Sequence, residues 1–155
     1  MTTESTIGKA LATAIAAATL PILAAGVASA GPYDPPPANP DDYLVGDTAY
    51  FQFQGHNCAI APTGDVGCDL GSSMQMTVGD EFFTDVREIL LDSSGYAAHP
   101  GPGVGTPHTL PAGNRELTGE LDYAGASCSP GLKADLRCES NGHTFWVWTP
   151  YASGS

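Results

Sequence analysis

The sequence predicts a small, mainly β domain, an antiparallel sandwich or barrel-like fold stapled by two disulfides. Three observations predict it. Short strand-like segments recur along the chain, 19 glycines and 13 prolines punctuate them, and four cysteines fall into two equally spaced pairs. Between the glycines and prolines, no stretch is long enough to supply a helix bundle.

The strand candidates are bounded by clusters of Gly, Pro and Ser. They are residues 48–54, 57–61, 65–70, 73–78, 85–92 and 144–148. One segment is ambiguous, because Phe82, Phe83 and Val86 begin a helical spacing and Asp80 precedes them as a cap. The stretch 86–91 is also consistent with a buried strand, so we expect a strand preceded by a short helical turn.

The cysteines form two pairs with nine residues between the members of each: Cys58 with Cys68, and Cys128 with Cys138. An even count at matched spacing favours disulfides, since zinc motifs usually hold ligands about two to four residues apart. Four cysteines allow three connectivities, and we favour the pairing within each spaced pair. Pro and Gly in residues 61–65 suit a hairpin turn, whereas Pro130 predicts an edge or loop-like second hairpin.

The first thirty residues have the pattern of a cleavable signal peptide. Lys9 precedes an almost wholly apolar run, 11–27, and the run ends at Ala28-Ser29-Ala30, which suits a signal peptidase. Pro21 disfavours a straight membrane span, and an uncleaved anchor is the alternative. No cysteine follows the run as a lipid-anchored precursor would require, so we expect a secreted product with no membrane attachment after cleavage.

The mature chain is expected to have two parts. Residues 31–42 contain five prolines and one aromatic residue, which predicts a disordered, PPII-like leader. A proline-rich ligand for a partner is the alternative. Residues 43–155 are then a single mainly β domain.

The net charge of −12 limits the partners of this chain. An acidic protein repels nucleic acid and anionic lipid headgroups, so neither is expected to bind. No Asp-x-Asp-x-Asp-Gly loop is present, and we expect neither a dedicated metal site nor a cofactor. Chance pairs among the many acids, such as those of Asp80, Glu81 and Glu88, do not by themselves predict a glycosidase.

Residues 96–113 form a long Gly/Pro/His-rich segment without strand signals. Such loops are often functional or mobile. His99 and His108 lie within it, but nine residues apart on a flexible tether they make a poor metal site.

Several of these positions resemble a known group. Phe53, Cys58 and Cys68-Asp69 in the first hairpin, and Cys128, Cys138 and Gly142-His143-Thr144-Phe145 near the end, stand where small uncharacterised secreted proteins and lipoproteins of mycobacteria and related actinobacteria carry similar residues. The resemblance implies an exported actinobacterial origin and a double-hairpin disulfide plan. It implies no activity.

The best candidate binding surface is aromatic. Strand alternation sends Phe145 and Val147 to one face and Trp146 and Trp148 to the other. With Tyr151 and His143 nearby, the two tryptophans would offer a platform for a sugar or for an apolar patch of a partner protein. The alternative is that both faces are buried.

Three functions follow from these features. The first is a non-catalytic binding module of the cell envelope or extracellular space, which recognises a glycan or a protein. The second is a small extracellular hydrolase that uses His143 or His56, although no Gly-x-Ser-x-Gly or His-Glu-x-x-His motif is present. The third is an exported inhibitor that presents the long loop. We rank them in this order, so an enzyme is not the first expectation.

Overall fold

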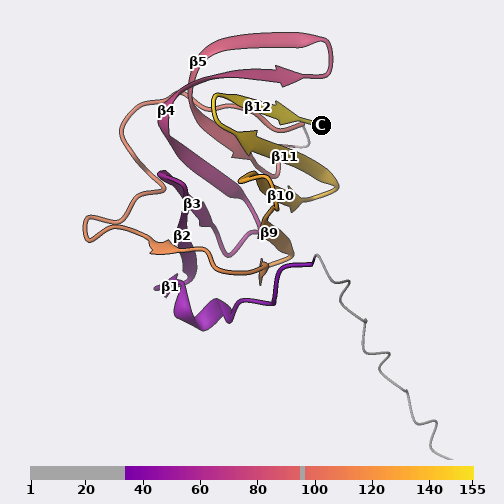
Figure 1. Cartoon of the computed structure of the whole chain (residues 1–155). Coiled ribbons are helices and arrows are strands. Elements are labelled where there is room, and N and C mark those ends of the chain that lie inside the picture. Colours follow the sequence, from indigo (N-terminus) through magenta and orange to yellow (C-terminus); the bar gives the residue numbers. More distant parts are fainter. Residues whose placement is uncertain (1–33, 95–96) are drawn as a thin grey trace, which may run out of the picture.

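Short alternating segments and tight glycine turns fold this chain into one curled, antiparallel-rich sheet that forms a half-barrel (Figure 1). The computed structural model describes residues 34–94 and 97–155, so the expected signal peptide lies outside the described residues. The mainly β fold is confirmed.

The described residues contain one 3-10 helix, η1 (Pro40–Asp42), and twelve strands. The strands are β1 (Leu44–Val45), β2 (Thr48–Phe53), β3 (His56–Ile60), β4 (Val66–Val78), β5 (Glu81–Leu91), β6 (His99–Pro100), β7 (Arg115–Glu116), β8 (Leu121–Tyr123), β9 (Ala126–Pro130), β10 (Leu136–Ser140), β11 (His143–Trp148) and β12 (Tyr151–Gly154).

The sheet runs in the order β1-β2-β3-β4-β12-β11-β10-β9-β8. Strand β5 pairs with both β4 and β6, and β7 lies parallel to β2. The C-terminal strand β12 pairs in parallel with the second half of β4, and this pairing joins the first half of the chain to the second. Strand β4 therefore belongs to both halves of the curled sheet, and the core lies between them (Figure 1).

Strand β5 is extended from its first residue, so the expected helical turn is wrong. Phe82 pairs opposite Thr77 of β4, and its ring is 61% exposed. Asp85 has a positive φ of 58°, and the register shifts between the Met74 and Met76 pairings. An irregularity of this kind changes which side chains face the core, and it produced a spacing that resembles a helix.

Both disulfides have the predicted connectivity. Cys58 lies opposite Cys68 across the β3–β4 hairpin, and Cys128 lies opposite Cys138 across β9–β10. All four side chains are fully buried. Each of these hairpins follows a strand and a two-residue turn in the left-handed region, at Gln54-Gly55 and Ala124-Gly125 respectively, so the second half of the chain repeats the local plan of the first.

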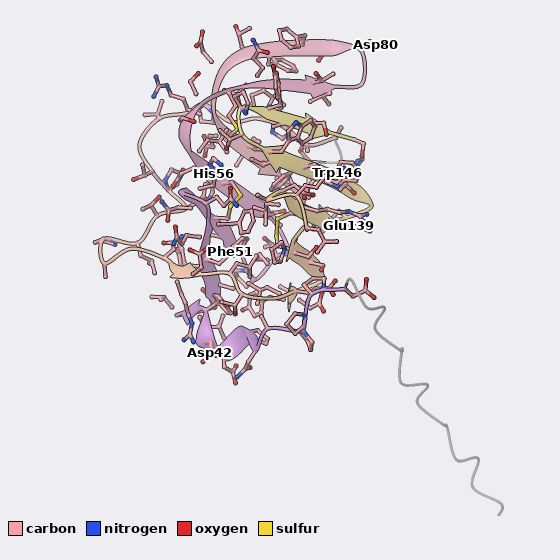
Figure 2. All side chains as sticks on the ribbon, viewed as in Figure 1. Asp42, Phe51, His56, Asp80, Glu139 and Trp146 are labelled. Carbon is pink, nitrogen blue, oxygen red and sulfur yellow. A yellow bond between two sulfur atoms is a disulfide. The ribbon has the colours of Figure 1, made fainter. Side chains whose placement is uncertain are left out.

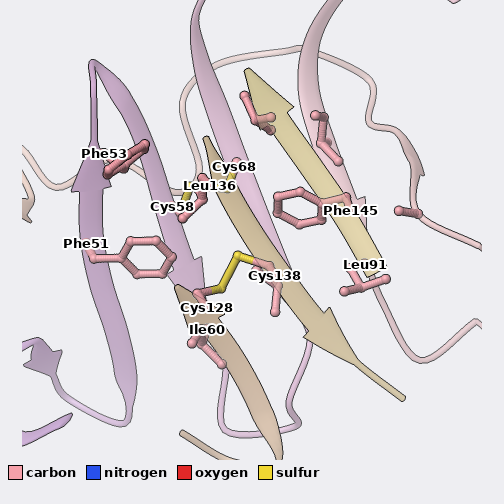
Figure 3. Close-up of a cluster of buried hydrophobic side chains, with 14 of the residues drawn as sticks. Phe51, Phe53, Cys58, Ile60, Cys68, Leu91, Cys128, Leu136, Cys138 and Phe145 are labelled. Atoms are coloured by element: carbon pink, nitrogen blue, oxygen red, sulfur yellow. A yellow bond between two sulfur atoms is a disulfide. The ribbon is translucent and has the colours of Figure 1, made fainter. Parts of the chain in front are cut away.

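The core fills the interior of the half-barrel, where both disulfides lie among aromatic and aliphatic side chains (Figure 3). Its largest fully buried members include Phe51, Phe145, Ile60, Met76, Ile89, Leu91, Leu121 and Leu136. Phe145 and Val147 point into this core, as alternation predicted.

Part of the expected disordered leader is ordered. The amide of Ala38 donates to the carbonyl of Glu120 (2.7 Å), and the amide of Glu120 donates to the carbonyl of Pro36 (2.8 Å). Pro37 and Glu120 form a parallel bridge. The proline-rich composition suits this role because an extended segment can add to a strand edge through its remaining amides.

Candidate functional site

Two tryptophans and a tyrosine are exposed together on the outer side of β11 and β12. Trp148 lies directly opposite Tyr151, and Trp146 follows on the same face of β11, opposite Ser153. Trp146, Trp148 and Tyr151 are 46%, 39% and 47% exposed. We call these three side chains the aromatic face; Figure 2 marks Trp146 at its place on β11. The alternative expectation, that both faces of β11 are buried, is wrong.

Polar groups flank the aromatic face. Arg137 of β10 lies opposite Trp146, with its guanidinium carbon 5.9 Å from the centre of the indole ring. Its Nη2 also donates to Glu139 at 3.0 Å. A shallow groove of about 350 Å³ borders Trp146, lined also by Arg137, Thr144, Ser153, Gly154 and Ser155. The surface therefore combines flat apolar rings with hydrogen-bonding groups.

His143 is not part of the aromatic face. It is the first residue of β11 and is half-buried. Strand alternation places it on the side of Phe145, and its cross-strand partner Ser140 is buried. The structure thus brings together three of the four predicted binding residues and separates the fourth.

His56 is buried and acts as a tie between distant turns. Its Nδ1 accepts from the amide of Gly71 (3.2 Å), so the ring proton sits on Nε2, which lies 3.2 Å from the Thr149 hydroxyl. Burial lowers the pKa of His56 below 6.5 and keeps the ring neutral. Because Nε2 already carries a proton, His56 cannot accept one from Thr149, and this pair lacks the arrangement of a base and a nucleophile.

A second polar cluster was missed at the level of sequence. Asp69 of β4 lies opposite Glu88 of β5, and both point away from the core. Each is nevertheless buried, at 8% and 4% exposure. The connection between β6 and β7 covers them and places His108 Nε2 3.1 Å from Glu88 Oε1. Candidate donor atoms of the three residues all lie within 4.8 Å of one another.

The same connection is fastened to the sheet at further points. Asn114 receives a hydrogen bond from the amide of Leu110 (2.8 Å), and its Nδ2 donates to the carbonyls of Phe51 and His108 (2.9 and 2.8 Å). The long loop expected to be functional or mobile is therefore held against the outer face of β2 to β5, where Figure 1 shows it running past β3 and β4. The available signal was weak: Asp69 follows the buried Cys68, and Glu88 precedes the apolar residues 89–91.

Comparison with protein-family models, with curated proteins and with solved structures finds no match for this chain. Among residues 34–94 and 97–155, no helix has the length and apolar character needed to cross a membrane. The two disulfides indicate an oxidising environment of the kind found outside the cell.

Proposed function

We propose that this protein is an exported, non-catalytic module that binds a glycan of the cell envelope or extracellular space through the aromatic face. The observation that carries the proposal is the alignment of Trp146, Trp148 and Tyr151 on one rigid, exposed sheet surface. Contiguous exposed apolar groups of this kind mark interaction surfaces. Export is supported by the signal-like residues 1–30, by the resemblance to secreted actinobacterial proteins and by the disulfides.

The chemistry of the surface favours a sugar over a protein partner. A sugar ring offers C–H groups on its faces and hydroxyls at its edge, which match aromatic rings flanked by polar side chains. Arg137 and Glu139 supply such polar groups beside Trp146. Glutamate, in contrast, is depleted in protein interfaces, which disfavours a protein partner beside Glu139.

Rigidity adds to the case. Trp146 and Trp148 sit on a strand whose inner side holds Phe145 in the core, next to the Cys128–Cys138 disulfide in the neighbouring hairpin (Figure 3). A surface held in place from behind loses little conformational entropy when a ligand binds.

Tryptophan fluorescence tests the proposal directly, because both tryptophans of the chain lie on the aromatic face. Titration with a panel of soluble envelope polysaccharides is expected to change the emission with at least one of them. Trp146→Ala, Trp148→Ala and Tyr151→Ala should each weaken binding about tenfold or more, measured by calorimetry.

Leu132→Ala is the matched control, since Leu132 is 78% exposed in the turn between β9 and β10. This variant should bind as the unmodified chain does. Unchanged emission across the panel, or an equal loss of binding in Leu132→Ala, would contradict the proposal. Binding to a protein and to no polysaccharide would contradict the choice of ligand.

A further inference from the structure

We propose that Asp69, Glu88 and His108 form a binding site for a divalent transition-metal ion of the Zn²⁺ type. The site lies on the outer face of β4 and β5 under the β6–β7 connection, away from the aromatic face, and it does not depend on the proposed glycan function. The sequence predicted no such site, because only the fold brings His108 to two carboxylates that precede it in the chain.

The donor set fits this class of ion. One imidazole nitrogen and two carboxylate oxygens suit Zn²⁺ and its neighbours, whereas Ca²⁺ and Mg²⁺ prefer six or more oxygens or several waters. Donor atoms of the three residues lie within 4.8 Å of one another, and a bound ion would draw each of them to about 2 Å. Three protein ligands leave a position for water or another group.

The charge of the cluster also points to a cation. Two carboxylates, each less than one-tenth exposed, lie side by side across β4 and β5. Among the described residues, the only basic side chain paired with either of them is His108, which can offset at most one negative charge. Buried charges are unfavourable unless they are compensated, and a divalent ion would neutralise both carboxylates.

The loop holds the carboxylates as the surroundings of a metal site do. The amide of His108 and the hydroxyl of Thr109 both bond Asp69 Oδ2 (2.8 and 2.7 Å), and the amide of Gly103 bonds Glu88 Oε2 (2.9 Å). These bonds fix one oxygen of each carboxylate, and Glu88 Oε1 faces His108. Outer hydrogen bonds of this kind orient metal ligands and raise their affinity.

Two glycines make room for the cluster. A Cβ at Gly67 would overlap the His108 ring, and a Cβ at Gly101 would overlap the Glu88 carboxylate. Beside His108, a groove of about 200 Å³ extends over the outer face between Tyr50, Gly67, Leu90 and Pro107. Of the three donor residues, His108 lines this groove.

The test is a calorimetric titration of Zn²⁺ into the full chain with both disulfides formed, after treatment with a chelator. We expect one ion per chain, displaced little by a roughly tenfold excess of Ca²⁺. Asp69→Asn and Glu88→Gln should weaken binding about tenfold or more, and His108→Ala should abolish it.

His99→Ala and Asp92→Asn are matched controls, since His99 Nε2 lies 3.8 Å from Asp92 Oδ2 in a second, more exposed imidazole–carboxylate pair. Both controls should keep the stoichiometry and affinity. Absence of one-to-one binding, its persistence in His108→Ala, its loss in His99→Ala, or a preference for Ca²⁺ would each overturn the proposal.

A measurement on the unmodified chain guards against variants that fail to fold. Zn²⁺ should shift the NMR signals of the His108 ring and leave those of His56 in place, and the unfolding temperature should rise as the Zn²⁺ concentration exceeds Kd. If the cluster only fastens the loop, Zn²⁺ will change neither signal nor temperature, and the proposal falls.

Discussion

His56 and Thr149 are 93 positions apart in the chain, yet the imidazole Nε2 lies 3.2 Å from the threonine hydroxyl. The contact links the β2–β3 turn to the β11–β12 turn, and Figure 2 marks His56 near the top of β3. Because the ring is buried in its neutral form, its protonation opposes folding, and we expect acid to destabilise the protein.

The free energy of unfolding should fall as the pH drops below about 6.5. Burial lowers the pKa of folded His56 below 6.5, so the unfolded chain binds a proton that the folded chain resists. Well above pH 6.5 the ring is neutral in both states and contributes no further pH dependence. Urea unfolding at several pH values should show a shallower acid decline in His56→Gln than in the unmodified chain.

His143→Gln is the control for that measurement, since His143 is only half-buried. It should keep the decline of the unmodified chain. Equal declines in the unmodified chain and in His56→Gln would contradict the role given to burial of His56.

Removal of either disulfide should lower the free energy of unfolding by about 2–4 kcal/mol. Each bridge closes a loop between residues ten positions apart and lies in the core. Paired replacement of Cys58 and Cys68, or of Cys128 and Cys138, by Ala should show this loss in guanidinium unfolding without reductant. Peptide mapping that joins one hairpin to the other would contradict the connectivity.

Truncation to alanine on opposite faces of β11 should change the free energy of unfolding by very different amounts. Phe145→Ala empties a fully buried site and should cost about 3–5 kcal/mol. Trp148→Ala removes a ring that is 39% exposed, and it should cost far less while it weakens glycan binding. Thermal unfolding of both variants checks the contrast, and equal losses would contradict the assignment of faces.

Gly67→Ala should dislodge His108. The new Cβ would overlap an imidazole that is held at Glu88, and overpacking of this kind costs about 1–3 kcal/mol. In a His108→Ala background the same substitution should cost much less, because the ring is gone. A double-mutant cycle measures the coupling, and strictly additive effects would contradict the contact.

The hairpins and their disulfides follow from local sequence. Pro62 and Gly64 set a turn between Cys58 and Cys68, so pairing and register are both readable there. Alternation along β11 likewise assigned Phe145 and Trp146 to opposite faces. These features depend on residues close together in the chain, where turn chemistry and period carry the information.

Features that depend on distant segments were not predictable. The register of β5 is set by irregularities in its pairing with β4. The position of Pro36 depends on a hydrogen bond from the amide of Glu120, 84 residues further along the chain. The cluster at His108 combines three segments, and nothing in the spacing of His99 and His108 reveals it. Asp69 and Glu88 each lie next to apolar residues of their strands, but the sequence alone does not show that a distant loop covers them.

Each disulfide joins two cysteines that are consecutive in the sequence, the first with the second and the third with the fourth. The first disulfide, Cys58–Cys68, can therefore form before Cys128 and Cys138 have been synthesised. Neither ring encloses a cysteine of the other pair, so no disulfide joins the two halves, which are held together by core packing and by the β12–β4 pairing.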